Sequence, residues 1–222
     1  METLFDAPAE PPREPRVIAP GAVHVPDWLT LEQQAWLVAR YTEWVAGPVP
    51  SRRAATRGGR MSVSTVCLGW HWRPYAYTRE AVDVNGARVL EVPDWMVRLG
   101  RRALAAAHDD PPPAYTPDTA LVNFYDDAAR MGMHQDKEEV VDSPVVSLSI
   151  GDTATFRFGN TEHRNRPWTD VELRSGDLFV FGGPSRFAFH GVTGTAPGTA
   201  PAGCGLTSGR INITLRETGL SD

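Results

Sequence analysis

The chain has 222 residues, a formal net charge of −5, and a composition that is 41% hydrophobic and 22% charged. These fractions are ordinary for a globular protein, and the length suits one well-buried domain. The acidic balance argues against indiscriminate nucleic-acid binding, which is largely electrostatic, and no run approaches the roughly 18 apolar residues of a membrane-spanning helix.

Residues 1 to about 22 are rich in proline, and we expect an extended, poorly ordered leader there. This segment has neither the basic start nor the apolar core of a secretory signal. Cys67 and Cys204 are too few for a disulfide framework or a zinc knuckle. The sequence therefore favours a reducing, cytoplasmic location.

Residues 23–119 are predicted to contain two helices. The first follows Thr30, which with Gln33 resembles a capping box, and it ends before Gly47-Pro48. The second runs roughly from Asp94 to Ala107. Between them lies the β-prone, aromatic-rich stretch Met61–Tyr77.

A basic loop, Ser51–Arg60, precedes that stretch. The simplest interpretation is a solvated loop, and it gains interest only if it borders a functional site. It has no acidic residue and carries Arg52, Arg53, Arg57 and Arg60.

From Ala120 onward the sequence changes to short β-prone runs separated by Gly, Asn, Asp or Pro. This pattern is typical of a β-sandwich or jelly roll. We predict a mainly β (α+β) fold in which two helices support a jelly-roll core over residues 120–222. The predicted strands cover residues 120–125, 145–150, 155–158, 171–174, 177–181, 187–190 and 210–216.

The segment Met131–Asp136 reads MGMHQD and places His134 and Asp136 two residues apart. On an extended backbone, residues i and i+2 point the same way, so both side chains can reach one point. Two residues cannot hold a transition metal alone, and His190, in the run RFAFHG, offers a third ligand. Two histidines and one carboxylate, with other coordination positions open, form the ligand set of non-haem Fe(II) oxygenases.

The last predicted strand reads RINITLR and has two different faces. Arg210, Asn212, Thr214 and Arg216 share one face, while the apolar residues share the other, which must be buried. If the polar face also points inward, its guanidinium groups need an anion such as a small dicarboxylate. The alternative, which this strand alone slightly favours, is an edge strand whose polar face lies in water.

These motifs together resemble the AlkB-like 2-oxoglutarate- and Fe(II)-dependent dioxygenases, the alkylated-DNA repair family. The H-x-D pair alone is a weak signal, but its order with a downstream R-x-N-x-T-x-R strand is specific. The resemblance covers about Met61 to Gly219. The matching segments are Asn123–Tyr125, His134–Lys137, Pro144–Gly151, Phe156–Gly159, Gly176-Asp177, Gly182–Arg186, His190-Gly191 and Arg210–Arg216.

The resemblance implies a double-stranded β-helix core, preceded by N-terminal helices and a nucleotide-recognition lid. It implies that His134, Asp136 and His190 bind Fe(II), with 2-oxoglutarate and O2 as cosubstrates. Arg210 would pair with the distal carboxylate of 2-oxoglutarate. Arg216 would lie near the 2-oxo acid end and take part in catalysis beside Asp136. Supporting contacts would come from Asn123, Tyr125 and Asn212.

Within the lid, the LGW element that ends at Trp70 matches the family's base-stacking element. Trp70 would hold a flipped base, although a core aromatic is the plainer interpretation. The segment from Trp70 to Tyr77 is shorter than the family pattern and carries His71-Trp72, so the pocket can differ in shape. Further substrate contacts would come from Tyr75, Tyr77, Glu138, Arg164 and Met61.

The activity implied is oxidative demethylation of N-alkylated bases in DNA, with formaldehyde release after the methyl group is hydroxylated. We expect a monomeric enzyme that binds alkylated DNA, single-stranded or with the base flipped from a duplex. One alternative is a related dioxygenase that acts on RNA or on a protein side chain. Another is a non-catalytic β-sandwich module with a closed, tetrahedral zinc site.

Overall fold

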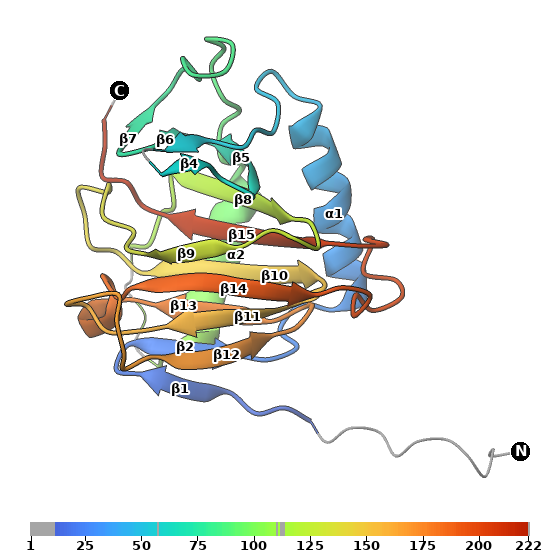
Figure 1. Cartoon of the computed structure of the whole chain (residues 1–222), viewed down its shortest axis with the longest axis vertical. Helices are drawn as coiled ribbons and strands as arrows, with labels where there is room; N and C mark the ends of the chain where they lie inside the picture. Colours follow the sequence, from blue (N-terminus) through green and yellow to red (C-terminus); the bar gives the residue numbers. More distant parts are fainter. Residues whose placement is uncertain (1–11, 57, 110, 112–113, 222) are drawn as a thin grey trace, which may run out of the picture.

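The computed structural model describes residues 12–56, 58–109, 111 and 114–221. Two antiparallel sheets face each other, and two short hairpins lie at one end of the molecule (Figure 1). This mainly β arrangement confirms the predicted jelly-roll core. In spatial order, the larger sheet contains β1 (Arg16–Ala19), β2 (Ala22–Val25), β13 (Leu178–Phe181), β10 (Val145–Gly151), β15 (Arg210–Arg216), β8 (Thr119–Tyr125) and β5 (Ser64–Leu68). The smaller sheet contains β12 (Thr169–Leu173), β11 (Thr153–Phe158), β14 (His190–Ala196) and β9 (Met131–His134). The hairpins are β3 (Ala55–Thr56) with β4 (Gly59–Arg60), and β6 (His71–Arg73) with β7 (Ala76–Thr78).

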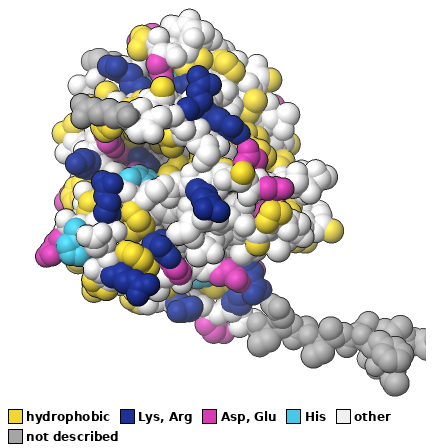
Figure 2. All heavy atoms as spheres, viewed as in Figure 1, with side chains coloured by type: hydrophobic (Ala, Val, Ile, Leu, Met, Phe, Trp, Pro, Cys, Tyr) yellow, Lys and Arg dark blue, Asp and Glu magenta, His cyan; other side chains and the backbone are white. Residues whose placement is uncertain are grey.

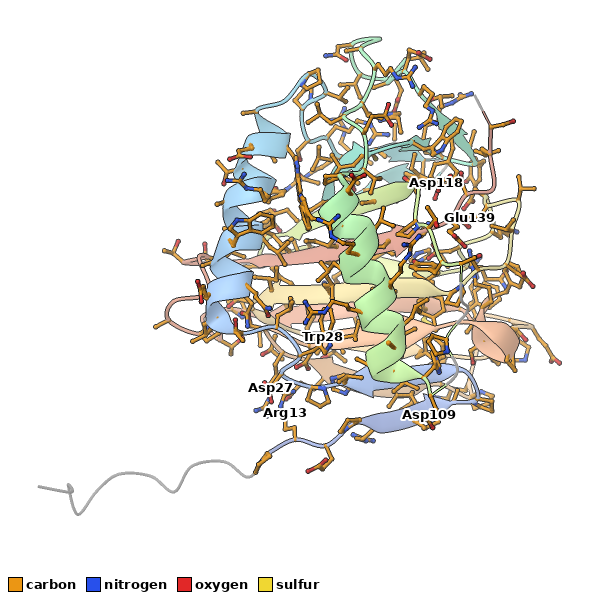
Figure 3. The ribbon with its side chains drawn as sticks, turned by 180° about the vertical axis from the view of Figure 1, so that it is seen from behind. Arg13, Asp27, Trp28, Asp109, Asp118 and Glu139 are labelled. Carbon is orange, nitrogen blue, oxygen red and sulfur yellow. The ribbon has the colours of Figure 1, made fainter. Side chains whose placement is uncertain are left out.

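Two helices, α1 (Leu31–Val45) and α2 (Asp94–Ala107), lie over the outer face of the larger sheet (Figure 3). The predicted capping box is present, since the Gln33 N–H donates to Thr30 Oγ1 and the Thr30 N–H donates to Gln33 Oε1. Neither described helix is long and apolar enough to cross a membrane. The apolar side chains of both helices share one buried cluster with the sheet, which includes Leu37, Trp44, Met96, Leu104, Val146, Leu148, Ile211, Ile213 and Leu215.

Strand β15 lies inside the larger sheet, between β10 and β8, and all seven of its residues are buried. Its apolar residues Ile211, Ile213 and Leu215 pack in the cluster beneath the helices. Because side chains alternate along a strand, its polar residues point the other way, into the space between the two sheets. The interpretation of a solvated edge strand is therefore wrong.

Aromatic side chains fill much of the space between the sheets. Phe156 and Phe158 of β11 face Phe179 and Phe181 of β13, with neighbouring ring centroids 4.9 to 6.3 Å apart. The ring of His190 lies 5.0 Å from that of Phe181 and 5.8 Å from that of Phe156. These aromatic rings therefore pack against the ring of His190 and hold it in place.

The N-terminal segment is more ordered than predicted. Residues 1–11 of the expected leader lie outside the described residues, but β1 and β2 extend the larger sheet through pairing of β2 with β13. Arg13 adds an ionic contact, with Nη2 at 2.7 Å from Asp177 Oδ1 and 2.6 Å from Asp27 Oδ1 (Figure 3). The expectation of poor order is thus wrong for residues 16–22, while the division into leader, lid and core stays a prediction.

The strand predicted at residues 187–190 is also wrong. A short 3-10 helix over Gly183–Ser185 and a turn, in which the Ala188 N–H donates to Ser185 O, occupy this region instead. Strand β14 begins at His190 rather than ending there. The run of aromatic residues favours a strand by composition, but local turn hydrogen bonds decide the backbone.

Candidate active site

Three predicted metal ligands converge at the ends of two paired strands. His134 ends β9, His190 begins β14, and the two are direct partners in the strand register. Nε2 of His134 lies 3.6 Å from Asp136 Oδ1, and Nε2 of His190 lies 3.4 Å from Asp136 Oδ2. The three candidate ligand atoms all lie within 4.8 Å of one another. One metal ion can therefore contact all three.

The orientation of both histidines suits metal binding. Nδ1 of His134 donates to Gly132 O, and Nδ1 of His190 donates to Ala188 O, each at 2.9 Å. Because a carbonyl can only accept, these bonds place the proton on Nδ1 and leave the Nε2 lone pair directed at the shared point. The residues present thus fit a bound metal ion.

Arg216 controls the charge of Asp136. Its Nη2 lies 2.7 Å from Asp136 Oδ2, and both side chains are almost completely buried. Burial alone would raise the pKa of Asp136, but Arg216 and His190 outweigh it and hold that pKa well below the ordinary range. Burial lowers the pKa of His190. Burial alone would also lower the pKa of His134, but the hydrogen bond and the charge of Asp136 outweigh burial and raise that pKa instead. The site therefore presents an ionised Asp136 and a neutral His190, and a metal ion would displace any proton from Nε2 of His134.

A small inner cavity extends from the ligands into the space between the sheets. At its far end Arg210 is 1% exposed, and its Nη2 donates to Ser149 Oγ at 3.0 Å. Its Nε and Nη1 have no hydrogen-bonding partner among the described residues, and burial lowers the pKa of Arg210. A buried guanidinium with free donors requires an anion. The other predicted cosubstrate residues line the same cavity: Asn123, Tyr125, Asn212 and Arg216.

A larger outer cavity of about 440 Å³ opens on the opposite side of the ligands. The two cavities share Asn123, Met131, His134, Asp136 and Arg216. On the surface this region forms a hollow in which a histidine side chain is visible, bordered by Lys and Arg side chains (Figure 2). Its walls contain Met61, Trp72, Tyr75, Leu121, Glu138, Arg164 and Phe189.

Comparison with known proteins assigns this geometry to a family. The sequence profile of the 2OG-Fe(II) oxygenase superfamily matches residues 21–216. The chain is 35% identical to the alpha-ketoglutarate-dependent dioxygenase AlkB of Escherichia coli (strain K12), with 99% of each chain covered. The chain belongs to the AlkB family.

Further relatives agree. An AlkB homolog of Caulobacter vibrioides is 36% identical, with 92% of this chain and 90% of the relative covered. ALKBH1D of Arabidopsis thaliana, named a DNA N(6)-methyladenine demethylase, is 33% identical, and our chain spans about half its length. A solved structure titled "The structure of OsALKBH1" matches with a TM-score of 0.81 and 33% identity, covering 91% of this chain and all of that one. The AlkB family depends on Fe(II) and 2-oxoglutarate, so Fe(II) is the ion expected at the ligand triad and 2-oxoglutarate the cosubstrate expected in the inner cavity.

Of the predicted base contacts, Met61, Tyr75, Glu138 and Arg164 line the outer cavity, but Trp70 does not. Trp70 is 6% exposed, packs in a core cluster with Val49 and Cys67, and stacks against Arg79, whose Cζ lies 3.8 Å from its ring centroid. The positive φ of +74° at Gly69 bends the chain between β5 and β6. In this placement Trp70 is a core aromatic and Trp72 lines the cavity, so the structure does not favour the predicted stacking of a base on Trp70.

Tyr77 also lies away from the outer cavity. It is 9% exposed, and its hydroxyl donates to Glu139 Oε1 at 2.6 Å. The placement of Tyr77 therefore does not support the predicted direct contact with a base. Glu138 does reach the cavity, but from a loop, because β9 ends at His134.

The basic loop borders a second hollow next to the outer cavity, and Pro74 lines both. Two of the four arginines are already paired: Arg52 Nε lies 3.0 Å from Asp83 Oδ2, and Arg53 Nη2 lies 2.6 Å from Asp126 Oδ2. Arg57 lies outside the described residues. Arg60 and Arg73, which sequence reasoning did not group together, line this hollow without an ion pair to any described residue.

Proposed function

We propose that this AlkB-family protein oxidatively demethylates N-alkylated bases in DNA, coupling 2-oxoglutarate decarboxylation to methyl hydroxylation and formaldehyde release. One observation carries the proposal. Two cavities of different chemistry meet at the metal ligands. One ends at Arg210, two of whose donors lack a partner among the described residues, and the other is lined by aromatic and apolar side chains together with Glu138 and Arg164. The first suits a small dicarboxylate and the second a planar base.

The protein's own residues divide the work. His134, Asp136 and His190 hold the metal, which supplies oxygen activation when bound. Arg210 would bind the distal carboxylate of 2-oxoglutarate and so set the orientation of this cosubstrate. Arg216 keeps Asp136 ionised and its carboxylate in place through the 2.7 Å ion pair.

The outer cavity would hold the base after it leaves the stack, since a paired base hides its reactive group inside the duplex. Trp72 offers an aromatic plane, worth roughly 1–3 kcal/mol for a stacked base. Glu138 places a carboxylate in the same cavity, which suits a cationic adduct such as N1-methyladenine or N3-methylcytosine.

The hollow next to the basic loop would receive the phosphate backbone beside the flipped base. Arg60 and Arg73 are available there, whereas Arg52 and Arg53 are held by acidic partners. A local group of basic side chains is compatible with the acidic chain, because phosphate contacts act over about one Debye length.

The direct experiment measures succinate and formaldehyde after incubation with Fe(II), 2-oxoglutarate and an oligonucleotide that carries N1-methyladenine. Formaldehyde should appear in proportion to succinate. Trp72→Ala should lower formaldehyde release by roughly tenfold or more, since it removes the stacking plane. Trp36→Ala, on the exposed side of α1, is the matched control and should have no effect. Succinate without formaldehyde on every methylated oligonucleotide would reject the proposal.

RNA is the second nucleic acid to assay, and a protein side chain would be indicated if neither nucleic acid is demethylated. The proposal further includes a monomer that acts in the cytoplasm. Cys67 and Cys204 are both free and buried, which is consistent with a reducing compartment.

A further inference from the structure

Glu139 is a buried carboxylate with a role that the proposed chemistry leaves open. Its side chain is completely buried, and it lies between two arginines. Oε1 is 3.0 Å from Arg216 Nη1, and Oε2 is 3.1 Å from Arg186 Nη2. Figure 3 labels this residue in the segment that connects β9 with β10.

Both arginines also contact the metal ligand Asp136. Arg216 holds its carboxylate at 2.7 Å, and Arg186 Nη1 donates to its backbone carbonyl at 2.7 Å. Arg186 is 1% exposed and also donates to Ser143 O. Glu139 therefore fixes the two groups that hold Asp136 at its side chain and at its backbone.

The same carboxylate connects to the hairpin of β6 and β7. The hydroxyl of Tyr77, on β7, donates to Glu139 Oε1 at 2.6 Å and accepts from Arg216 Nη1 at 3.1 Å. Tyr77 is the register partner of Trp72, which together with Tyr75 lines the outer cavity. A shift of this hairpin upon base binding would therefore move the Tyr77 hydroxyl, which is hydrogen-bonded to Arg216.

We propose that Tyr77 and Glu139 are positioning residues that couple occupation of the outer cavity to the placement of Asp136 at the metal. Base binding at Trp72 and Tyr75 fixes the position of the β6–β7 hairpin. The Tyr77 hydroxyl then orients the side chains of Glu139 and Arg216, and these two side chains position the metal ligand Asp136. The inference rests on the proposed function for its substrate, a methylated base. It adds a physical connection by which substrate and cosubstrate favour each other's binding.

The test measures that coupling without turnover. Mn(II) replaces Fe(II), and fluorescence anisotropy gives the affinity for an N1-methyladenine oligonucleotide with and without 2-oxoglutarate. By linkage, 2-oxoglutarate should tighten the wild-type affinity by some factor, and Tyr77→Phe should reduce that factor by roughly three- to tenfold, which is part of the full effect of one charge-assisted hydrogen bond. In turnover with Fe(II), the same variant should release several-fold less formaldehyde per succinate.

Tyr115→Phe is the matched control. Tyr115 is also buried, and its hydroxyl donates to the backbone oxygen of Leu215 at 3.1 Å rather than to Glu139. It should lose thermal stability to a similar extent while keeping the wild-type coupling factor. Glu139→Gln, which keeps the shape but not the charge, should lower the factor further if it folds.

The outcomes separate the two claims. No binding of the methylated oligonucleotide by the wild-type protein rejects the proposed function. Binding without coupling in the wild type, or with an unchanged factor in Tyr77→Phe, rejects the inference and leaves the proposed function standing.

Discussion

Replacement of Arg210 by Met removes the guanidinium at the end of the inner cavity while nearly keeping the length of the side chain. In the structure Nη2 of this group donates to Ser149 Oγ, while Nε and Nη1 have no hydrogen-bonding partner among the described residues. A charge-assisted hydrogen bond contributes about 1.5–3 kcal/mol, so the affinity for 2-oxoglutarate should fall roughly 10- to 150-fold.

The loss of 2-oxoglutarate affinity can be measured as a smaller rise in Tm when the ligand is added. At a 2-oxoglutarate concentration of about 100 times the wild-type Kd, binding stabilises the folded protein by about 2.7 kcal/mol. If Arg210→Met binds about 100-fold more weakly, the same concentration supplies only RT ln 2, about 0.4 kcal/mol. Thermal unfolding with Mn(II), measured with and without 2-oxoglutarate, should therefore show the ligand-induced rise in Tm almost disappear.

Without the ligand the variant should be no less stable than the wild type, because it removes buried donors that lack partners. Arg186→Met is the contrasting variant. Its guanidinium is fully paired, including with Glu139, and breaking a buried pair costs about 3–5 kcal/mol, which lowers Tm by roughly 6–20 °C. An unchanged 2-oxoglutarate effect on the Tm of Arg210→Met would refute the assignment of the inner cavity.

Asp136→Ala removes the only carboxylate of the metal triad and should abolish succinate formation; substantial succinate from the purified, metal-loaded variant would remove Asp136 from the ligand set. Glu138→Gln should slow single-turnover demethylation of cationic N1-methyladenine more than that of neutral N3-methylthymine, since the amide keeps shape and loses charge. Equal losses would show that Glu138 does not select for charge. Replacing Arg60 and Arg73 with Gln should weaken oligonucleotide binding and flatten its salt dependence, with turnover of a free methylated nucleoside unchanged; an unaltered salt slope would make the hollow a bystander.

Local rules were sufficient where the chemistry lies within a few residues. The capping box at Thr30 and the alternation of β15 depend on backbone geometry that neighbouring residues determine. The H-x-D spacing likewise keeps His134 and Asp136 close in the chain, although β9 ends at His134 and Arg216 and Arg186 hold Asp136 in place. For these features the amino-acid sequence alone determined the structure.

The tertiary structure decided which of two possible faces each side chain uses. Only the position of β15 between β10 and β8 buries Arg210, since the same alternation on an edge strand would leave it in water. Only the pairing of β9 with β14 brings His190 to His134.

The tertiary structure also decided the placement of aromatic and charged side chains near the lid. Trp70 and Trp72 are indistinguishable by residue type, but Trp70 precedes β6 and packs in the core, whereas Trp72 lies on β6 and lines the cavity. Glu139 follows a charged run that reads as solvated, yet Arg186 and Arg216, from distant segments, bury and neutralise it. A sequence specifies such contacts only through pairing between distant segments, because the partner that makes burial of a charge tolerable is brought near by the fold.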